Sequence, residues 1–165
     1  MKTVNYLLLV LAITLFSCKS EGKKTVETKK EELAIVVEKT IKKEETIFQK
    51  LGGEEGVSVI VEDIVARHLE NPKIQHYFVV LKENPEYFNQ FKQHVKDFLG
   101  AGTGGGTEYK GRDMIGAHKG LNLSESDFLE ALDDILSVLD EHKVDRTSRN
   151  ELLATLYSMK GAIIK

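Results

Sequence analysis

Five histidines and a single cysteine are the residues of this 165-residue chain whose chemistry suits a metal or a cofactor. His118 stands in the stretch GAHKGL, shortly after the glycine-rich run GAGTGGG at 100–106. Apolar residues lie four and three positions before it and three positions after it, which predicts an imidazole on the apolar side of a short helix. A lone histidine in such a place is packed in a core more often than it binds a ligand, so a second group is needed to indicate a site.

His94 is that second group. It lies three residues after Phe91 and four before Phe98, which predicts that its ring projects at the edge of a helix's apolar face. Two imidazoles on two helices, both aimed inward and joined by a flexible loop, can bracket a large, flat, apolar molecule. A closed zinc site needs further ligands, whereas haem needs only one or two axial histidines in an apolar pocket.

The other histidines give weaker indications. His68 lies in the apolar stripe of its helix and is interpreted as a core histidine hydrogen-bonded to the backbone, in preference to a ligand. His76 and His142 lie at positions typical of a loop and of the surface, and no function is assigned to them.

The stretch GAGTGG at 100–105 matches the dinucleotide-binding pattern G-x-G-x-x-G letter for letter. That pattern binds a pyrophosphate only between a strand and the start of a helix, within a βαβ unit. Here an amphipathic helix precedes the run, another loop follows it, and no parallel-sheet pattern exists. The run is therefore interpreted as a helix end that passes into a flexible loop of about ten residues, since glycine tolerates the backbone angles required.

Length and charge limit the class of protein. The chain suits one domain with a sizeable core, and its lone cysteine cannot form an internal disulfide. Charged residues make up 30% of the chain, both signs are interspersed, and the net charge is only -3. This balance argues against nucleic acid as the main partner.

The N-terminus predicts a secretory signal. Lys2 is followed by an apolar run over 6–16, which is too short for a membrane-spanning helix of about 20 residues but typical of a signal peptide. The letters LFSC at 15–18 are similar to the bacterial lipobox, which implies a signal peptide over 1–17, cleavage before Cys18 and lipidation of that cysteine. Acyl chains would hold the protein on a membrane, outside the cytoplasm in the periplasm or at the cell surface. The alternative is a buried apolar N-terminal helix with an incidental thiol.

Residues 18–45 are interpreted as a charged tether. Lysine and glutamate dominate this segment, and its one short apolar patch, at 33–37, does not interrupt the pattern of a flexible or partly helical spacer. After Thr46 apolar residues recur at helical spacing, and no strand pattern stands out. The domain over 46–165 is therefore expected to be all-α, with four substantial helices and two or three short ones.

Local signals place the longer helices. An apolar stripe at i, i+3, i+4 and i+7 predicts a helix over roughly 54–70. The pair Asn-Pro at 84–85 offers an N-cap and a first helical residue for a helix that runs to about Leu99. Ser124 opens a sequence that resembles a capping box before the third helix, and a last apolar stripe over 152–163 predicts the fourth.

Four stretches occur together in the order found in one protein family: FQKLGGEEGV at 48–57, NPKIQHYF at 71–78, QHVKDFLGAGTGG at 93–105 and YKGRDMIGAHKGL at 109–121. Residues 46–165 resemble the group I truncated haemoglobins. The resemblance implies a truncated globin-like two-over-two helical sandwich around haem b and its iron. It also implies that His118 is the proximal iron ligand and that Phe78 packs on the haem face.

The chain departs from this family at positions that affect ligand binding. The family usually has a tyrosine at the position of Val65 and often a glutamine at that of Val95, and Phe91 at the distal gate cannot replace these hydrogen-bond donors. Their loss should weaken oxygen retention about tenfold or more, since a hydrogen bond to a charged group contributes roughly 1.5–3 kcal/mol. His94 matches the position of a histidine that is a sixth iron ligand in some members, so the resemblance implies bis-histidyl haem.

Other residues are expected around the cofactor. The resemblance implies apolar contacts from Phe78, Phe91, Val95, Phe98 and Met114. Three cations either pair with the haem propionates or remain solvated at the surface: Lys92, Lys110 and Arg112.

The leading interpretation is a membrane-tethered haem globin that binds the diatomic gases oxygen, nitric oxide and carbon monoxide, with a redox partner as a further expectation. The alternative is a haem-free helical lipoprotein that acts as an interaction or structural module. An enzyme, such as a nitric oxide dioxygenase or a peroxidase, would need a reductant, and no source of one is obvious outside the cytoplasm. Enzymatic activity is therefore left open, with passive ligand binding favoured.

Overall fold

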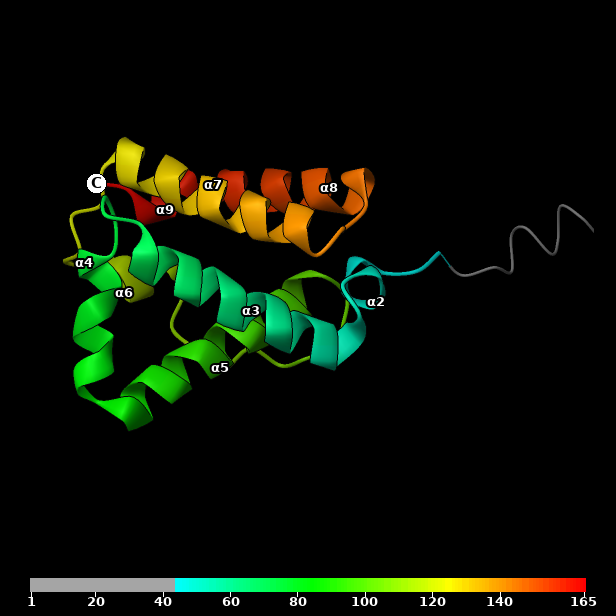
Figure 1. The fold of residues 1–165 in the computed structure, drawn as a ribbon, viewed down its shortest axis with the longest axis horizontal. Coiled ribbons are helices and arrows are strands. Elements are labelled where there is room, and N and C mark those ends of the chain that lie inside the picture. Colours follow the sequence, from blue (N-terminus) through cyan, green and yellow to red (C-terminus); the bar gives the residue numbers. More distant parts are fainter. Residues whose placement is uncertain (1–43) are drawn as a thin grey trace, which may run out of the picture. The chain divides into compact units, whose positions relative to one another are not determined.

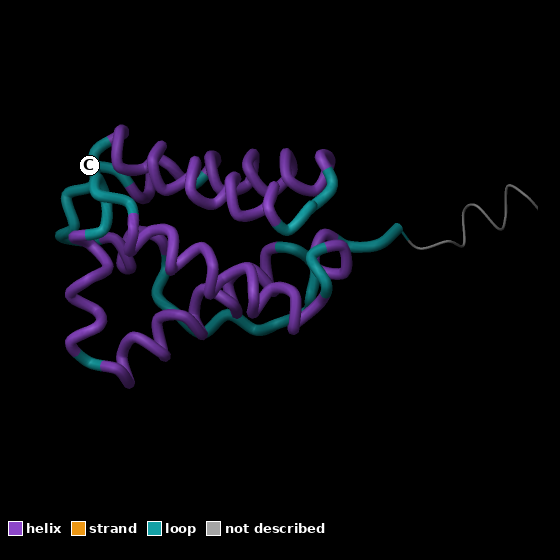
Figure 2. The backbone as a smooth tube through the Cα atoms, viewed as in Figure 1, coloured by secondary structure: helices purple, strands orange, loops and turns teal. Residues whose placement is uncertain are grey.

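The computed structural model describes residues 44–165, and Glu45–Lys165 form one compact unit. The expected signal peptide over 1–17, the expected lipidation site Cys18 and nearly all of the tether lie outside the described residues. Every regular element in the described part is helical, as Figure 1 and Figure 2 show. None of its helices is long and apolar enough to cross a membrane. The expectation of an all-α fold is confirmed for this part of the chain.

Two long helices form one layer of the domain. α3 spans Gly53–Glu70 and α5 spans Pro85–Gly102, close to the ranges that the sequence predicts. The side chain of Asn84 accepts a hydrogen bond from the backbone N–H of Tyr87 at 3.0 Å, and Pro85 supplies the first helical residue of α5. The Asn-Pro pair thus fixes where α5 begins.

A second pair of long helices forms the other layer. α7 spans Glu125–Glu141 and α8 spans Arg146–Ser158. The expected capping box is confirmed, because the N–H of Asp127 donates to Ser124 Oγ at 3.1 Å while the Asp127 carboxylate accepts from the N–H of Ser124 at 2.9 Å. The two helices are joined by a short turn.

The last apolar stripe is divided between two helices, contrary to the single helix expected over 152–163. α8 ends at Ser158, and α9 spans Lys160–Ile163. Between them the N–H of Met159 donates to the carbonyl of Leu156, three residues back, at 3.1 Å. Such a tightened turn ends an α-helix, and the glycine that soon follows is a weak helix former.

Short elements connect the layers: α2 (Ile47–Lys50), α4 (His76–Val79), the 3-10 helix η1 (Val80–Glu83) and α6 (Met114–His118). They outnumber the two or three short helices expected, because α4 and η1 fill the connection between α3 and α5. α6 follows the loop after α5 and carries His118 as its last residue.

The four long helices are arranged as two pairs. α3 packs against both α5 and α7, and α7 packs against α8 (Figure 1). This is the two-over-two arrangement expected from the resemblance. The core that joins the layers is apolar and buried: Leu51, Val57, Ile60, Val61, Ile64, Val65, Leu99, Val138, Leu139 and Leu152.

The glycine run belongs to the end of α5 and the turn after it. α5 continues to Gly102, beyond the expected end at Leu99. The N–H of Phe48 donates to the carbonyl of Thr103 at 2.9 Å. A Cβ on Gly105 would stand 2.6 Å from the ring of Phe48, so only glycine allows this contact. The run therefore fastens α2 to α5, and the part expected to be a flexible loop is partly packed.

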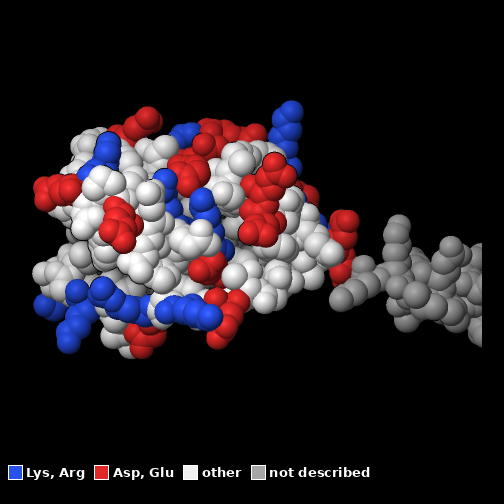
Figure 3. All heavy atoms as spheres, turned by 90° about the horizontal axis from the view of Figure 1, so that it is seen from below, with Lys and Arg blue, Asp and Glu red and all other residues white. Residues whose placement is uncertain are grey.

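Ion pairs link the helices at the surface, where Figure 3 shows both signs of charge on the face seen from below. Glu62 of α3 accepts hydrogen bonds from Lys92 and Lys96 of α5, at 2.8 and 2.9 Å. Partial burial raises the pKa of Glu62, but the two lysines outweigh it and hold the pKa below its ordinary value. Arg67 of α3 donates to Glu141 of α7 at 2.5 Å. α3 is thus tied to both of its neighbours.

Loss of the α7 capping box should destabilise the domain. We expect Ser124→Ala to lower the free energy of unfolding by about 1 kcal/mol, because the first turn of α7 loses a side-chain acceptor. Urea unfolding followed by circular dichroism measures this. Ser126→Ala, in the same exposed turn, is the matched control and should change stability by only a few tenths of a kcal/mol. Equal effects of the two substitutions would show that the cap contributes nothing.

Candidate functional site

A cavity of about 460 Å³ lies between the helix layers. This volume is in the usual range for small-molecule and cofactor sites. Its walls are mostly apolar, and most of the residues expected around a cofactor line it: Phe78, Phe91, His94, Val95, Phe98, Arg112, Met114 and His118. Two expected residues, Lys92 and Lys110, do not line it. The long helices α3, α5 and α7 and the short helix α6 all contribute wall residues.

His118 is held in a defined orientation at the end of α6. The Asp113 side chain accepts a hydrogen bond from the N–H of Gly116 at 2.6 Å and caps the start of this helix. At its other end, Nδ1 of His118 lies 2.8 Å from the carbonyl oxygen of Met114. A carbonyl can only accept, so Nδ1 carries the proton and Nε2 keeps a free lone pair.

The apolar side of α6 differs from the expectation at one position. Ile115, which the sequence spacing places beside His118, is 65% exposed. Met114, Ala117 and Leu121 line the cavity with His118 instead. α6 has only five residues, so residue spacing does not determine which of two neighbouring positions faces the cavity.

His94 lies in the middle of α5 and also lines the cavity. Its Nδ1 atom is buried and has no hydrogen-bond partner among the described residues. The ring meets Tyr109 edge to face, with 6.3 Å between centroids and 79° between planes. Aromatic contact therefore positions this imidazole without satisfying its buried nitrogen.

Tyr109 is a wall residue that sequence reasoning missed. Its hydroxyl donates to the carbonyl oxygen of Arg112 at 2.7 Å, and its ring packs edge-on against Phe98 at 5.4 Å. Burial, with a further contribution from the Asp113 carboxylate, raises the pKa of Tyr109. The only sequence feature that could have indicated this wall position is the presence of an aromatic residue in the stretch that precedes α6.

The wall formed by α3 and α5 offers few polar groups. Val65 is buried, and Val95 and Phe91 are partly buried among apolar neighbours. Valine and phenylalanine side chains donate no hydrogen bonds. Among the described residues of these two helices, the polar side chains that line the cavity are His68, Gln90 and His94, together with Tyr87.

The three cations expected near propionates have different surroundings. Lys92 donates to Glu62, and its ammonium lies 5.1 Å from the centroid of the Phe88 ring. Lys110 is exposed and pairs with Glu108 at 3.2 Å. Arg112 is exposed and lines the cavity, so it lies at the rim. Of the three, Arg112 is the one placed to meet a carboxylate at the opening.

His68 is buried as expected, but its partner is a side chain and not the backbone. Its Nδ1 donates to the carboxylate of Asp134 on α7 at 2.9 Å, and both residues are less than 10% exposed. The His68 ring stacks on Phe78 with 4.8 Å between centroids. The expectation failed because Asp134 lies 66 residues away in sequence, on the other layer.

The comparisons with known proteins agree with this geometry. A family model described as "Bacterial-like globin" matches residues 46–165. The chain belongs to the bacterial-like globin family. The group 1 truncated haemoglobin of Tetrahymena thermophila is 35% identical to this globin over 101 residues, which cover 61% of this chain and 79% of the relative.

Other relatives of this globin extend the match. The group 1 truncated haemoglobin of Synechocystis is 31% identical over 121 residues, covering 71% of this chain and 90% of the relative. The crystal structure of the truncated haemoglobin of Tetrahymena pyriformis in its Fe(III) form superposes with a TM-score of 0.65 at 28% identity. That superposition covers 73% of this chain and 98% of the other.

Membership of the globin family implies a haem cofactor with its iron and the binding of diatomic ligands to it. The residues present fit this group. The cavity is apolar, and His118 keeps an unprotonated nitrogen. A second imidazole, His94, also lines the cavity, and its buried Nδ1 has no hydrogen-bond partner among the described residues. Among the described residues no cluster of three or more His, Cys, Asp or Glu could hold a metal ion by itself.

The buried histidine should make the stability of the globin pH-dependent. Burial lowers the pKa of His68 from its ordinary 6.5, although the hydrogen bond to Asp134 opposes the shift. Below pH 6.5 the unfolded chain therefore binds a proton that the folded chain does not, so the free energy of unfolding falls as the pH drops. This group contributes a slope of at most about 1.4 kcal/mol per pH unit.

Urea unfolding between about pH 7.5 and 5.5 measures that slope. In His68→Gln the slope should be smaller, because the titrating group is gone. His76→Gln, at an exposed histidine, is the control and should keep the slope of the wild type. An unchanged slope in His68→Gln would contradict the expectation.

Proposed function

We propose that this chain is a membrane-tethered globin in which His118 is the proximal iron ligand and His94 is a displaceable sixth ligand. The observation that carries the proposal is the hydrogen bond from Nδ1 of His118 to the carbonyl of Met114 at 2.8 Å. Both imidazoles line the same apolar cavity, which supports a bis-histidyl arrangement. When bound, the haem supplies an iron that accepts diatomic ligands and can change its oxidation state.

The imidazole of His118 is already oriented for iron binding by a hydrogen bond within the protein. Histidines that bind metals nearly always donate their other ring N–H to a carbonyl, a carboxylate or a water, which fixes the tautomer and the ring orientation. The Met114 carbonyl performs this function for His118. The exposed fraction of His118 is intermediate, so its imidazole is reached from the cavity without being fully solvated.

His94 lacks the corresponding support. No described residue accepts a hydrogen bond from its buried Nδ1. Loss of such a partner typically reduces metal affinity by about 10- to 100-fold. His94 should therefore bind iron more weakly than His118 does and give way to an incoming diatomic ligand.

A released His94 can then donate a hydrogen bond to the ligand. Val65, Val95 and Phe91 cannot donate, and the Tyr109 hydroxyl is engaged with the carbonyl of Arg112. A labile donor in place of the family's usual fixed tyrosine and glutamine favours nitric oxide or carbon monoxide binding over tight storage of oxygen. Sensing or electron transfer would then be the outcome. Electron transfer would require a redox partner, and the same site could support turnover of reactive nitrogen species with that partner.

Absorption spectra of the haem-reconstituted full chain test the ligand assignment. We expect a low-spin six-coordinate spectrum in the ferric wild type and a high-spin spectrum in His94→Ala. His118→Ala should lose stoichiometric haem uptake, because the oriented ligand is removed. His142→Ala, at a surface histidine, is the matched control and should retain the wild-type spectrum.

Each alternative predicts a different spectrum. A five-coordinate or water-ligated spectrum of the wild type that is unchanged in His94→Ala would reject the bis-histidyl site. The cavity would then be open to gases. Absence of haem uptake by the wild type would favour a haem-free helical module. Turnover of nitric oxide or peroxide with an added electron donor would instead make the globin an enzyme.

Lipidation at Cys18 is the second part of the proposal and rests on the lipobox-like residues 15–18. Labelled fatty acid should enter the wild type and be absent from Cys18→Ser. The wild type should sediment with membranes outside the cytoplasm, while the variant should be released. Equal labelling of both proteins would contradict the proposal of an acyl anchor at Cys18.

A further inference from the structure

An open groove lies on the outer side of the α7–α8 pair. The two helices run antiparallel and form the layer of the domain farthest from α5, as Figure 1 shows. The groove between them is lined mainly by apolar side chains, among which Leu129 of α7 and Tyr157 of α8 are 47% and 48% exposed. Nearly half of the surface of each of these large residues is therefore in contact with solvent.

Both helices present a regular spacing to the groove. On α7 the lining residues recur at i, i+4 and i+7: Leu129, Asp133 and Leu136. On α8 they recur at i, i+3 and i+7: Asn150, Leu153 and Tyr157. Helices that pack side by side in bundles and coiled coils have this spacing. Phe128 and Ile135 of α7 line the central cavity instead, so the stripe that faces the groove is a second one on the same helix.

We propose that this groove is the interface of a homodimer, in which the α7–α8 pair of a second copy completes a four-helix bundle. The side-chain ridge of one helix fits the groove between two others, and the chain itself supplies a pair with the matching spacing. A two-fold axis that runs along the groove places α7 of each copy on α8 of the other. The same surface is then used by both copies, as a two-fold interface requires.

The charges of the two helices select this orientation. α7 contains seven carboxylates and no lysine or arginine, whereas α8 contains two arginines and one glutamate. Packing α7 on α7 of the second copy would bring like charges together. Packing α7 on α8 brings opposite charges together, and such complementarity fixes the register of an interface. The charge pattern thus favours a second copy in one defined arrangement.

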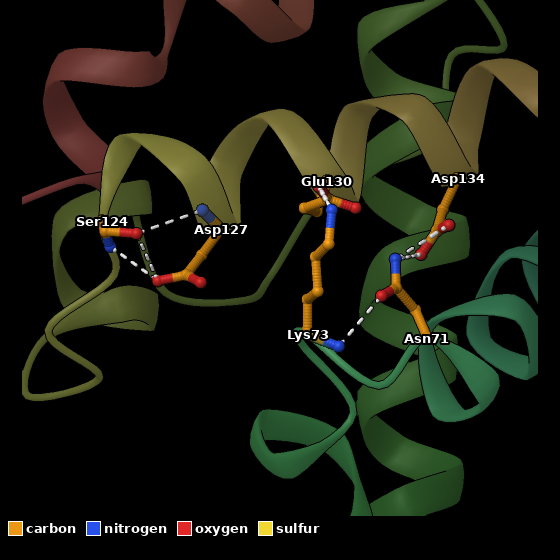
Figure 4. A network of polar contacts seen from close by, with 6 residues as sticks. All are labelled: Asn71, Lys73, Ser124, Asp127, Glu130 and Asp134. Carbon is orange, nitrogen blue, oxygen red and sulfur yellow. Dashed lines mark hydrogen bonds and ion pairs between the residues drawn. The ribbon is translucent and has the colours of Figure 1, made fainter.

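Part of the acidic charge of α7 is already used within the chain. Asp127, Glu130 and Asp134 have hydrogen-bond partners there, as Figure 4 shows. Asp133 lines the groove, is exposed and has no hydrogen bond or ion pair among the described residues. The side of α7 that faces the groove therefore keeps a carboxylate that can accept from a second copy.

The turn between the helices determines which residues face one another. Because the helices are antiparallel, residues equally far from Lys143 in sequence lie at the same level of the pair. A two-fold axis along the groove preserves these levels, so Leu129 faces Tyr157 of the second copy, and Asp140 faces Arg146. Arg146 is exposed and has no ion pair among the described residues. The bundle would thus have apolar contacts along the groove and an ion pair at each end.

Sedimentation equilibrium tests the association. The chain used is residues 18–165 with Cys18→Ser, the mature form that signal cleavage would leave, because this removes the apolar run over 6–16 and the only thiol. We expect a reversible monomer–dimer equilibrium between micromolar and millimolar protein, with and without bound haem. A wild type that stays monomeric over this range would overturn the proposal and leave the groove to another partner.

A pair of matched substitutions tests the position of the interface. Leu129→Lys places a charge at the apolar contact and should raise the dimer dissociation constant by about tenfold or more. Val59→Lys is the control, because Val59 of α3 is 48% exposed and does not line the groove. Its dissociation constant should stay within about twofold of wild type. A dimer that both substitutions leave equally stable would overturn the proposal.

A charge exchange tests the orientation and does not depend on loss of stability. Asp140→Arg and Arg146→Asp should each weaken the homodimer, because each places like charges opposite one another. An equimolar mixture of the two variants should form a heterodimer, since opposite charges then meet at both ends. Circular dichroism checks that both variants are folded. If the mixture associates no better than either variant alone, the arrangement of α7 on α8 is rejected.

The inference does not require haem, so it can fail separately from the proposed function. A monomer with a six-coordinate haem spectrum would overturn the dimer and leave the haem assignment intact. A dimer of the predicted arrangement that takes up no haem would support the interface and overturn the proposed function.

Discussion

The apolar cavity at the centre of the domain is the constraint on which the other features of the structure depend. A helical domain of this size normally fills its centre with side chains, yet here a cavity of about 460 Å³ lies between the layers. The walls must then be held by contacts at their edges. Glu62 ties α3 to α5, Arg67 ties α3 to α7, and the packing of Phe48 on Gly105 fixes the end of α5. A cofactor that binds only the folded chain would add its binding free energy to stability.

The two cavity histidines differ in whether a ring nitrogen finds an acceptor. His118 is the last residue of α6, and its Nδ1 reaches back to the carbonyl of Met114, the residue that opens this short helix. His94 stands in the middle of α5, where backbone carbonyls accept from the N–H groups four residues on. Among the residues that the structure describes, none pairs with its Nδ1. The His118 ring is therefore oriented by a backbone acceptor, whereas the His94 ring is held by aromatic contact with Tyr109.

The sequence predicted the features that depend on short-range signals. The start of α5 at the Asn-Pro pair, the capping box at Ser124 and the cavity positions of His94 and His118 are each encoded within one or two helical turns. Features that depend on contacts between distant segments were missed. Tyr109 joins the wall because a loop brings it beside His94, and its pattern in sequence is that of any loop aromatic.

The same limit explains the errors in the expected apolar faces. Ile115 is turned to solvent because α6 is too short for its neighbours in space to be deduced from spacing. α8 ends at Ser158 because the turn at Met159 tightens, although the apolar spacing continues into α9. Periodicity therefore identified the long helices and could not resolve elements of four or five residues.

The His68–Asp134 pair is difficult to explain by stability alone. Placing a carboxylate in an apolar interior has a desolvation penalty that hydrogen bonds offset only in part, and apolar residues of similar volume are often as stable or more so. Here three hydrogen bonds, one from His68 and two from Asn71, converge on that single carboxylate, which fixes its position against the imidazole. The imidazole is in turn fixed by stacking on Phe78, a residue of the cavity wall. The polar network thus links the C-terminal end of α3 to α7, next to the cavity wall that His68 and Phe78 form. The network therefore fixes a part of the cavity wall, because the imidazole that Asp134 holds carries the stacked ring of Phe78.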